Sequence, residues 1–240
     1  MIREFWVRNF FSIRDKQELN FEAKKTDCPL VAEVAEGVFL YKLGILFGAN
    51  ASGKSNMLLA LNEVFTVLVS SSVDDSEAIK GRVPFKLTED EPTEMYVSFY
   101  VSGVRYDYYV TFNDRVIISE QLYYYPNNYK TVFYERDYVG EKLQSNIKFG
   151  ASLKLQPDTQ ETIRSNTLNN HSVLAVCKKV AFKEDIAPFT ALHSWIMSNY
   201  HEVDGDGIKG TVEILKNAYN NPRKRKFFNL MFSRIIIRVF

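Results

Sequence analysis

The chain opens with alternating polar and apolar residues, the pattern of a strand with one buried face. In residues 2–10, Arg3, Phe5 and Val7 face one side, and Ile2, Glu4 and Trp6 face the other. A turn at residues 9–15 separates this strand from residues 17–22, which alternate again. The pattern predicts an antiparallel pair.

Periodicity then predicts a strand, a loop and a helix in succession. A strand over residues 38–43 leads to a short apolar strand at residues 43–47. Past the glycine-rich residues 48–53, apolar residues recur at helical spacing, which predicts a helix over residues 54–68. The apolar face would consist of Met57, Leu58, Leu61, Val64, Phe65 and Leu68.

The second half changes from strand patterns to helix patterns. An antiparallel meander of about four strands is predicted, with Gly, Asn, Asp or Pro at the turns; its strands are residues 95–101, 104–112, 116–125 and 131–136. After Gly150, helices are predicted at residues 158–165, 168–180, 188–200 and 210–219. The fold class is therefore α/β (α+β), with a lobe at residues 1–150 and a helical segment at residues 151–240.

Composition narrows the class of protein. The apolar fraction is 46%, the charged fraction 25% and the net charge +1, values typical of a globular chain with no global attraction to nucleic acid or membrane. Cys28 and Cys177 match no metal spacing and indicate reduced thiols. No apolar run reaches the length of a membrane span, and residues 1–6 carry charge where a secretory signal would need its apolar core. We therefore expect a cytoplasmic protein.

The loop between the apolar strand and the helix carries the strongest motif. It reads G-x-x-x-x-G-K-[ST], the phosphate-binding loop, in the strand–loop–helix context that this motif requires. Its residues are Gly48, Ala49, Asn50, Ala51, Ser52, Gly53, Lys54 and Ser55, followed by Asn56.

Each residue type suits a triphosphate. Gly48 and Gly53 allow backbone angles that turn consecutive N–H groups inward, so that they form an anion nest at the positive end of the helix. Lys54 would reach the β and γ phosphates, and the Ser55 hydroxyl would ligate Mg²⁺. The loop predicts ATP and Mg²⁺ as ligands.

Hydrolysis is left open by the sequence. A P-loop ATPase also needs an apolar strand ending in Asp or Asp-Glu, which holds magnesium and polarises the attacking water. Residues 116–120 end in Glu120 but carry a serine in the apolar run, and residues 235–240 contain no acid. The apolar ending indicates either a truncated or frameshifted reading frame, or a C-terminal strand that docks into a sheet.

Other candidate sites have simpler interpretations. The meander tyrosines could stack on nucleic-acid bases, although aromatic residues are in any case favoured in strands. Residues 223–226 form a basic cluster that could touch DNA or RNA phosphates or be a solvated helix face. Residues 204–208 lack the glutamate that closes a calcium loop, and a structural role is expected for each histidine: His171, His193 and His201.

Two segments together resemble a known family. Residues 5–15, Phe-Trp-Val-Arg-Asn-Phe-Phe-Ser-Ile-Arg-Asp, and residues 48–56 resemble the ABC-type ATPase heads of bacterial AAA-family ATP-binding proteins. These include abortive-infection ATPases and relatives of the overcoming-lysogenization-defect nucleases, and more distantly the heads of structural-maintenance-of-chromosomes proteins. Residues 84–87, 91–93, 119–123 and 133–136 extend the resemblance over the first two-thirds of the chain.

The resemblance implies an ATP-binding N-terminal part of such a head, in anti-phage defence or a DNA-associated process. Ser12 and Arg14 match a position near the nucleotide. Full-length heads would form a homodimer around ATP and drive an effector protein. The signature motif, second magnesium motif and switch histidine have no match here.

Three alternatives remain at this point. The chain could be a nucleotide-binding or inert fragment that acts as an interaction module without hydrolysis. It could bind DNA or RNA independently of nucleotide, through residues 223–226. A P-loop kinase is a further rival, for which the hairpin meander offers no lid arginine cluster or acceptor site.

Overall fold

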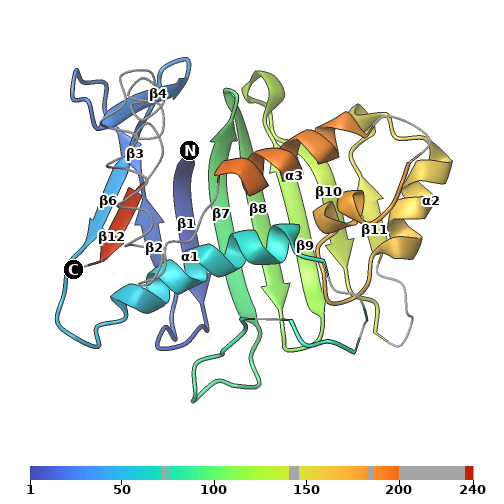
Figure 1. The fold of residues 1–240 in the computed structure, drawn as a ribbon, viewed down its shortest axis with the longest axis horizontal. Coiled ribbons are helices and arrows are strands. Elements are labelled where there is room, and N and C mark those ends of the chain that lie inside the picture. Colours follow the sequence, from blue (N-terminus) through green and yellow to red (C-terminus); the bar gives the residue numbers. More distant parts are fainter. Residues whose placement is uncertain are drawn as a thin grey trace, which may run out of the picture.

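A large antiparallel sheet forms the body of the protein. The computed structural model describes residues 1–71, 74, 76–79, 81–140, 146–182, 186–199 and 236–239 of the 240. Within them, seven strands are ordered β11-β10-β9-β8-β7-β1-β2, with neighbours antiparallel (Figure 1). Their bounds are β1 Ile2–Arg8, β2 Gln17–Asn20, β7 Thr93–Val101, β8 Val104–Phe112, β9 Ile117–Tyr124, β10 Thr131–Asp137 and β11 Asn146–Phe149.

Two smaller sheets lie beside the β1–β2 end of the large sheet (Figure 1). One has the order β3-β5-β4, with β3 Glu22–Ala23, β4 Val31–Ala35 and β5 Val38–Tyr41. The other pairs β6 (Leu43–Leu46) with β12 (Ile236–Val239) in parallel, with Leu43 opposite Ile236. The last apolar run of the sequence therefore contains a strand that docks beside the one leading into the glycine-rich loop.

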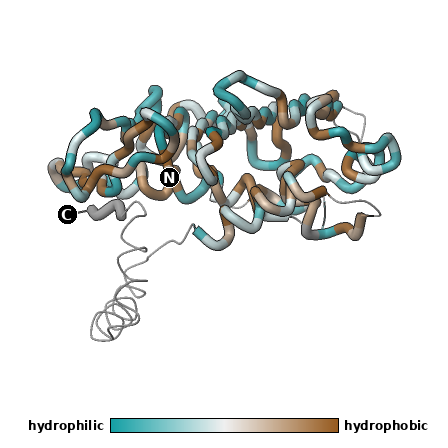
Figure 2. Tube along the Cα trace, turned by 90° about the horizontal axis from the view of Figure 1, so that it is seen from above, coloured by the Kyte–Doolittle hydropathy of each residue, from teal (hydrophilic) through white to brown (hydrophobic). Residues whose placement is uncertain are grey.

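The helices lie on one side of the large sheet (Figures 1 and 2). They are α1 (Lys54–Val69), α2 (Pro157–Asn166) and α3 (Ala187–Asn199), with 3₁₀ turns η1 (Pro126–Asn128), η2 (Ala151–Leu153) and η3 (Leu174–Lys178). One apolar core fills the space between sheet and helices. Across it, Phe65 meets Phe99 edge to face, and Phe99 stacks on Trp195. Further core residues are Phe5, Val7, Val64, Leu68, Val97, Val110, Leu122 and Phe189.

Most predicted elements are confirmed. Strand β1 pairs antiparallel with β2, and Phe5 and Val7 are fully buried. Helix α1 begins at Lys54, as the spacing indicates, and buries Met57 and Phe65. The meander is one strand longer than predicted, because β11 adds to β7–β10.

Two local predictions are wrong, and two strands are absent from the predicted elements. Residues 17–22 form no continuous strand, because the Glu22 N–H donates to the Asn20 side chain (2.7 Å) and Glu22 then pairs with Leu40 of β5 instead of with β1. Strands β4 and β11 have no counterpart in the predicted elements. Residues 168–180 form only the 3₁₀ turn η3.

The failed helix has a physical cause in a buried polar network. Arg136, fully buried on β10, donates to the carbonyls of His171 and Leu168 (2.6 and 2.8 Å), which a helix would need for its own hydrogen bonds. Its partner Glu120 lies 3.6 Å away and is also fully buried. Glu120 accepts hydrogen bonds from the Ser172 hydroxyl and, at 3.2 Å, from the Val173 N–H. Tertiary contacts therefore outweigh helical periodicity here.

Several remaining expectations concern sites. His171 is buried and its Nε2 accepts from the Leu168 N–H (3.2 Å), while His193 is buried with its Nε2 3.3 Å from the Val69 carbonyl oxygen.

No helix in the described ranges is both long and apolar enough to cross a membrane. The predicted helix at 210–219, His201, the turn at 204–208 and the basic cluster at 223–226 lie outside the described residues. The division at residue 150 stays a prediction.

Candidate functional site

The glycine-rich loop joins β6 to α1 at the surface of the molecule. Residues 48–52 are exposed, and Phe47, which enters the loop, is 77% exposed. Lys54 and Asn56 are half-buried at the helix start, and Ser55 is exposed. The loop is therefore open to a ligand from solvent.

Both glycines of the motif occupy places that a side chain would disturb. A Cβ on Gly48 would lie 2.7 Å from the Ser52 hydroxyl oxygen, which is closer than such atoms approach. Gly53 has φ = +88°, and Ala51 also lies in the left-handed region at φ = +63°. Left-handed residues in such a loop can turn neighbouring N–H groups to one side, which is the geometry of an anion nest. Ala51 adopts this conformation at a cost that functional loops often carry.

The start of α1 is left without a cap. Gly53 occupies the N-cap position, no side chain of a described residue bonds to the free N–H groups, and the first turn carries no carboxylate. A helix normally fills this position with Ser, Thr, Asp or Asn. The N–H groups and positive dipole end consequently remain available to an external anion.

Lys54 folds its side chain back across the loop. Its Nζ donates to the carbonyl oxygens of Gly48 (2.9 Å) and Ala49 (2.7 Å), and lies 3.4 Å from the Ser52 hydroxyl. These bonds join the two ends of the loop, and the ammonium has three donors. Since the Ser52 contact is the long one, one donor can turn to a phosphate without loss of the two carbonyl bonds.

Ser12, from the turn after β1, lies against this helix start. Its hydroxyl accepts a hydrogen bond from the Asn56 amide (2.7 Å). A Cβ on Gly53 would lie 3.2 Å from the same oxygen. Arg14, on the same turn, is exposed, and its side chain makes no hydrogen bond or ion pair with another described residue. The structure thus brings Ser12 to the loop, while Arg14 points to solvent.

Ser55 fits the chemistry of magnesium. Mg²⁺ is commonly held by one or two protein oxygens together with substrate phosphates and water, so it needs no cage of carboxylates. Within the described residues, no group of three His, Cys, Asp or Glu side chains could hold a metal ion by itself. The exposed hydroxyl of Ser55, at the second residue of α1, is the protein oxygen that the motif offers to the ion.

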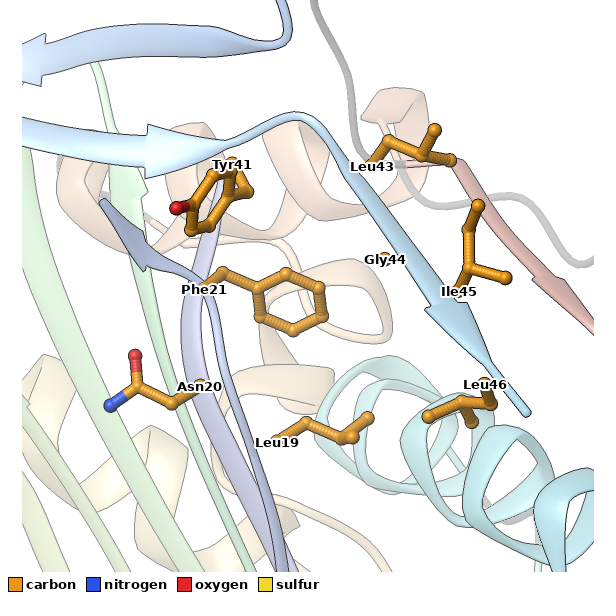
Figure 3. Close-up of a pocket in the computed structure, with 8 residues that line it drawn as sticks. All are labelled: Leu19, Asn20, Phe21, Tyr41, Leu43, Gly44, Ile45 and Leu46. Atoms are coloured by element: carbon orange, nitrogen blue, oxygen red, sulfur yellow. The ribbon is translucent and has the colours of Figure 1, made fainter. Parts of the chain in front are cut away.

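A small, mostly apolar pocket lies between β6 and residues 19–21 (Figure 3). Its volume is about 180 Å³, less than the roughly 300 Å³ of small ligand sites. Gly44 is required here, because a Cβ would lie 2.8 Å from the Phe21 ring. The pocket is therefore a packing feature of β6; it is lined by Leu19, Asn20, Phe21, Tyr41, Leu43, Gly44, Ile45 and Leu46.

The tyrosines of the meander divide between the two faces of the sheet. Tyr106, Tyr108 and Tyr124 pack with the core on the helix side, whereas others alternate to the opposite face. There, ring centroids of Tyr96 and Tyr109 are 4.4 Å apart, and Lys130 Nζ lies 3.7 Å over Tyr123. Because neighbouring side chains already cover these rings, the contacts favour sheet packing. This agrees with the expectation that aromatic residues are favoured in strands, and base stacking is the alternative that nothing here tests.

The loop, the uncapped helix and the adjoining turn make an anion-binding geometry, and comparison with known families agrees. Residues 45–235 match the model of a family described as AAA domain, putative AbiEii toxin, Type IV TA system. The chain belongs to this family. Its members are AAA-domain proteins, for which nucleotide binding with ATPase activity is the general expectation, and its description carries the abortive-infection relation that the sequence resemblance indicates. No curated protein matches the chain.

Proposed function

We propose that the chain binds ATP with Mg²⁺ on residues 48–55, as the N-terminal part of an ABC-type ATPase head. The observation that carries this proposal is the uncapped, positively polarised start of α1, with Lys54 beside it and two left-handed residues in the loop before it. The N–H groups of this arrangement lack partners, and the negative oxygens of a triphosphate can accept their hydrogen bonds. Family membership supports the same ligand class.

Each loop residue has one role in the proposal. The N–H groups of the loop and of the helix start bind phosphate oxygens, except that of Ser52, which donates to the Ala49 carbonyl (3.2 Å). Lys54 neutralises the β and γ phosphates, and Ser55 ligates Mg²⁺. Gly48 and Gly53 keep the backbone close to the ligand. Magnesium, when bound, neutralises charge between the phosphates. Ser12 and Asn56 hold the start of the helix, and a role for Arg14 near the nucleotide rests on the family resemblance alone.

The wider role that we propose follows the family. Full-length copies would dimerise around ATP, and closure of the dimer would drive a partner effector in bacterial anti-phage defence or a DNA-associated process. The word toxin in the family description supports a defence setting. Turnover by this chain alone is a separate question, because the sequence offers no second magnesium motif.

Binding of fluorescent ATP to the purified chain tests the proposal directly. Lys54→Ala should weaken binding by at least about a hundredfold, because it removes the charge facing the phosphates and the bonds that hold the loop. Lys130→Ala, which removes an exposed ammonium on the other sheet face, should leave binding unchanged. Equal binding by the wild-type chain and Lys54→Ala would overturn the proposal.

Measurement of phosphate release distinguishes an ATPase from a protein that binds ATP without hydrolysing it. Steady turnover by the 240-residue chain that is lost in Lys54→Ala would establish an ATPase. Tight binding without turnover would instead favour the second candidate, a nucleotide-binding interaction module.

A further inference from the structure

Asn9, at the end of β1, is a buried residue with an unusual conformation. It is 1% exposed and has φ = +54°, in the left-handed region that Asn enters more readily than most residues. Phe11, two residues on, has φ = +48°. The turn that carries Ser12 is thus shaped by two left-handed residues.

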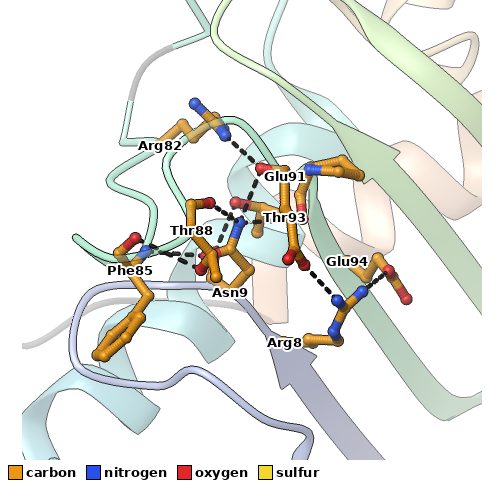
Figure 4. A network of polar contacts seen from close by, with 9 residues as sticks. Arg8, Asn9, Arg82, Phe85, Thr88, Glu91, Thr93 and Glu94 are labelled. Atoms are coloured by element: carbon orange, nitrogen blue, oxygen red, sulfur yellow. Dashed lines mark hydrogen bonds and ion pairs between the residues drawn. The ribbon is translucent and has the colours of Figure 1, made fainter.

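The Asn9 side chain binds a second segment, residues 85–92, at several points (Figure 4). Its Nδ2 donates toward the carbonyl oxygens of Thr88 (3.0 Å), Glu91 (2.7 Å) and Pro92 (3.2 Å). Its Oδ1 accepts from the Phe85 N–H (3.0 Å) and the Thr88 hydroxyl (2.7 Å). Two amide hydrogens and one carbonyl oxygen therefore serve five partners, which saturates the side chain.

The same residue fixes the turn through its backbone. The Asn9 N–H donates to the Arg14 carbonyl (3.2 Å), and the Asn9 carbonyl accepts from the Thr93 hydroxyl (2.8 Å). The Phe11 N–H adds a bond to the Val83 carbonyl (2.7 Å). The turn is consequently attached on one side to the segment before β7, a rigid strand of the large sheet.

The other side of the turn meets the start of α1. Ser12 accepts from the Asn56 amide and packs against Gly53, as described above. A continuous set of contacts therefore runs from residues 85–93 through Asn9 and the turn to Ser12 and then to the helix start. Ser12 itself is exposed, and on either side of it the buried Phe10 and Ile13 exchange two backbone hydrogen bonds (2.8 Å each) that close the turn. The Asn9 side chain adds the bonds that attach this turn to residues 85–92.

We propose that Asn9 is a positioning residue of the phosphate-binding loop, which acts by holding Ser12 against Gly53 and Asn56. This inference rests on the proposed function of the loop. Without the Asn9 amide, the turn loses its attachment to residues 85–92, Ser12 no longer fixes the helix start, and the N–H groups that would receive phosphate lose their alignment.

Nucleotide affinity in a double-mutant cycle tests the inference. Asn9→Gly keeps the left-handed backbone and removes only the amide, and Ser12→Ala removes the hydroxyl. Each should raise the Kd for fluorescent ATP about three- to tenfold, the effect of one to two hydrogen bonds. Because Asn9 acts through Ser12, Asn9→Gly should change the Kd less than twofold when Ser12 is already alanine. Independent, multiplying effects would overturn the inference.

Asn170→Gly is the matched control. Asn170 is buried like Asn9, and its Nδ2 also donates to two loop carbonyls, those of Asp74 and Glu77 (2.7 and 2.9 Å), with no contact to Ser12. It should lower the Tm and leave the Kd within twofold. Amide hydrogen exchange without nucleotide should rise at residues 53–56 in Asn9→Gly and stay unchanged in Asn170→Gly. Equal exchange in the two variants would contradict a positioning role.

The remaining outcomes are also decisive. If Asn9→Gly does not fold, Thr88→Val removes a single hydroxyl donor to Asn9 and should raise the Kd about twofold; an unchanged Kd in a folded Thr88→Val overturns the inference. If wild-type protein and Lys54→Ala bind ATP equally, the proposed function itself fails. If wild-type protein binds ATP and folded Asn9→Gly binds it equally well, only the role of Asn9 fails.

Discussion

Two polar regions of this molecule differ in how completely the chain satisfies them. The Glu120–Arg136 pair is fully buried, and carbonyls, hydroxyls and an N–H of the chain surround it. The loop at residues 48–55 is exposed, and the helix start beside it has no cap among the described side chains. Buried polar groups need partners from the chain itself, whereas exposed donors need none and can bind a ligand. The difference separates a structural network from a candidate binding site.

The largest expected effect is loss of the buried pair. Arg136→Met leaves the Glu120 carboxylate buried without its cation and removes the bonds that fix the Leu168 and His171 carbonyls. The free energy of unfolding should fall by about 3–5 kcal/mol, as measured by urea titration. The folded fraction should keep the wild-type Kd for ATP. A stability loss below about 1 kcal/mol would mean that the network is unimportant for the fold.

Alkaline pH should act on the same network. Burial raises the pKa values of Tyr108 and Tyr134 well above the usual tyrosine value, and the nearby charge of Glu120 raises them further. The stability linked to a raised tyrosine pKa is present below the unfolded-state value of about 10 and is lost as pH rises above it. The free energy of unfolding should therefore fall above about pH 10. Tyr134→Phe should reduce the slope there, and an unchanged slope would contradict this assignment.

The sequence predicts the features set by local patterns and misses those set by contacts between distant residues. The loop residues are contiguous and helix α1 is amphipathic, so local patterns suffice to find both, including the helix start at Lys54. The segment after residue 168 is mispredicted because its carbonyls are taken by Arg136, more than thirty residues away. Ser12 was found only through family resemblance. The sequence does not reveal the role of Asn9, because its partners lie at residues 85–92. The one local signal is an Asn directly after a strand, which is compatible with a left-handed turn.

A smaller effect, confined to binding, is expected at the first loop glycine. Gly48→Ala brings a Cβ to 2.7 Å from the Ser52 hydroxyl, so the loop must shift. The Kd for ATP should rise about tenfold, while the free energy of unfolding of this exposed loop variant changes by less than about 0.5 kcal/mol. Adding Ser52→Ala removes the clashing oxygen and should restore part of the affinity. Wild-type affinity in Gly48→Ala would show that the loop tolerates a side chain and that its closeness to the ligand is not needed.

The smallest effect should appear only when magnesium is present. Ser55→Ala removes the hydroxyl proposed to ligate Mg²⁺ and leaves the loop N–H groups and Lys54 in place, so the Kd for ATP measured with EDTA should be unchanged. With Mg²⁺, affinity should fall about three- to tenfold, since phosphate oxygens and water still hold the ion. Ser55→Thr keeps the hydroxyl and should bind as the wild type does. A loss of equal size with EDTA would instead mean that Ser55 supports the helix start, as Ser12 and Asn56 do, and that the protein gives magnesium no oxygen at this position.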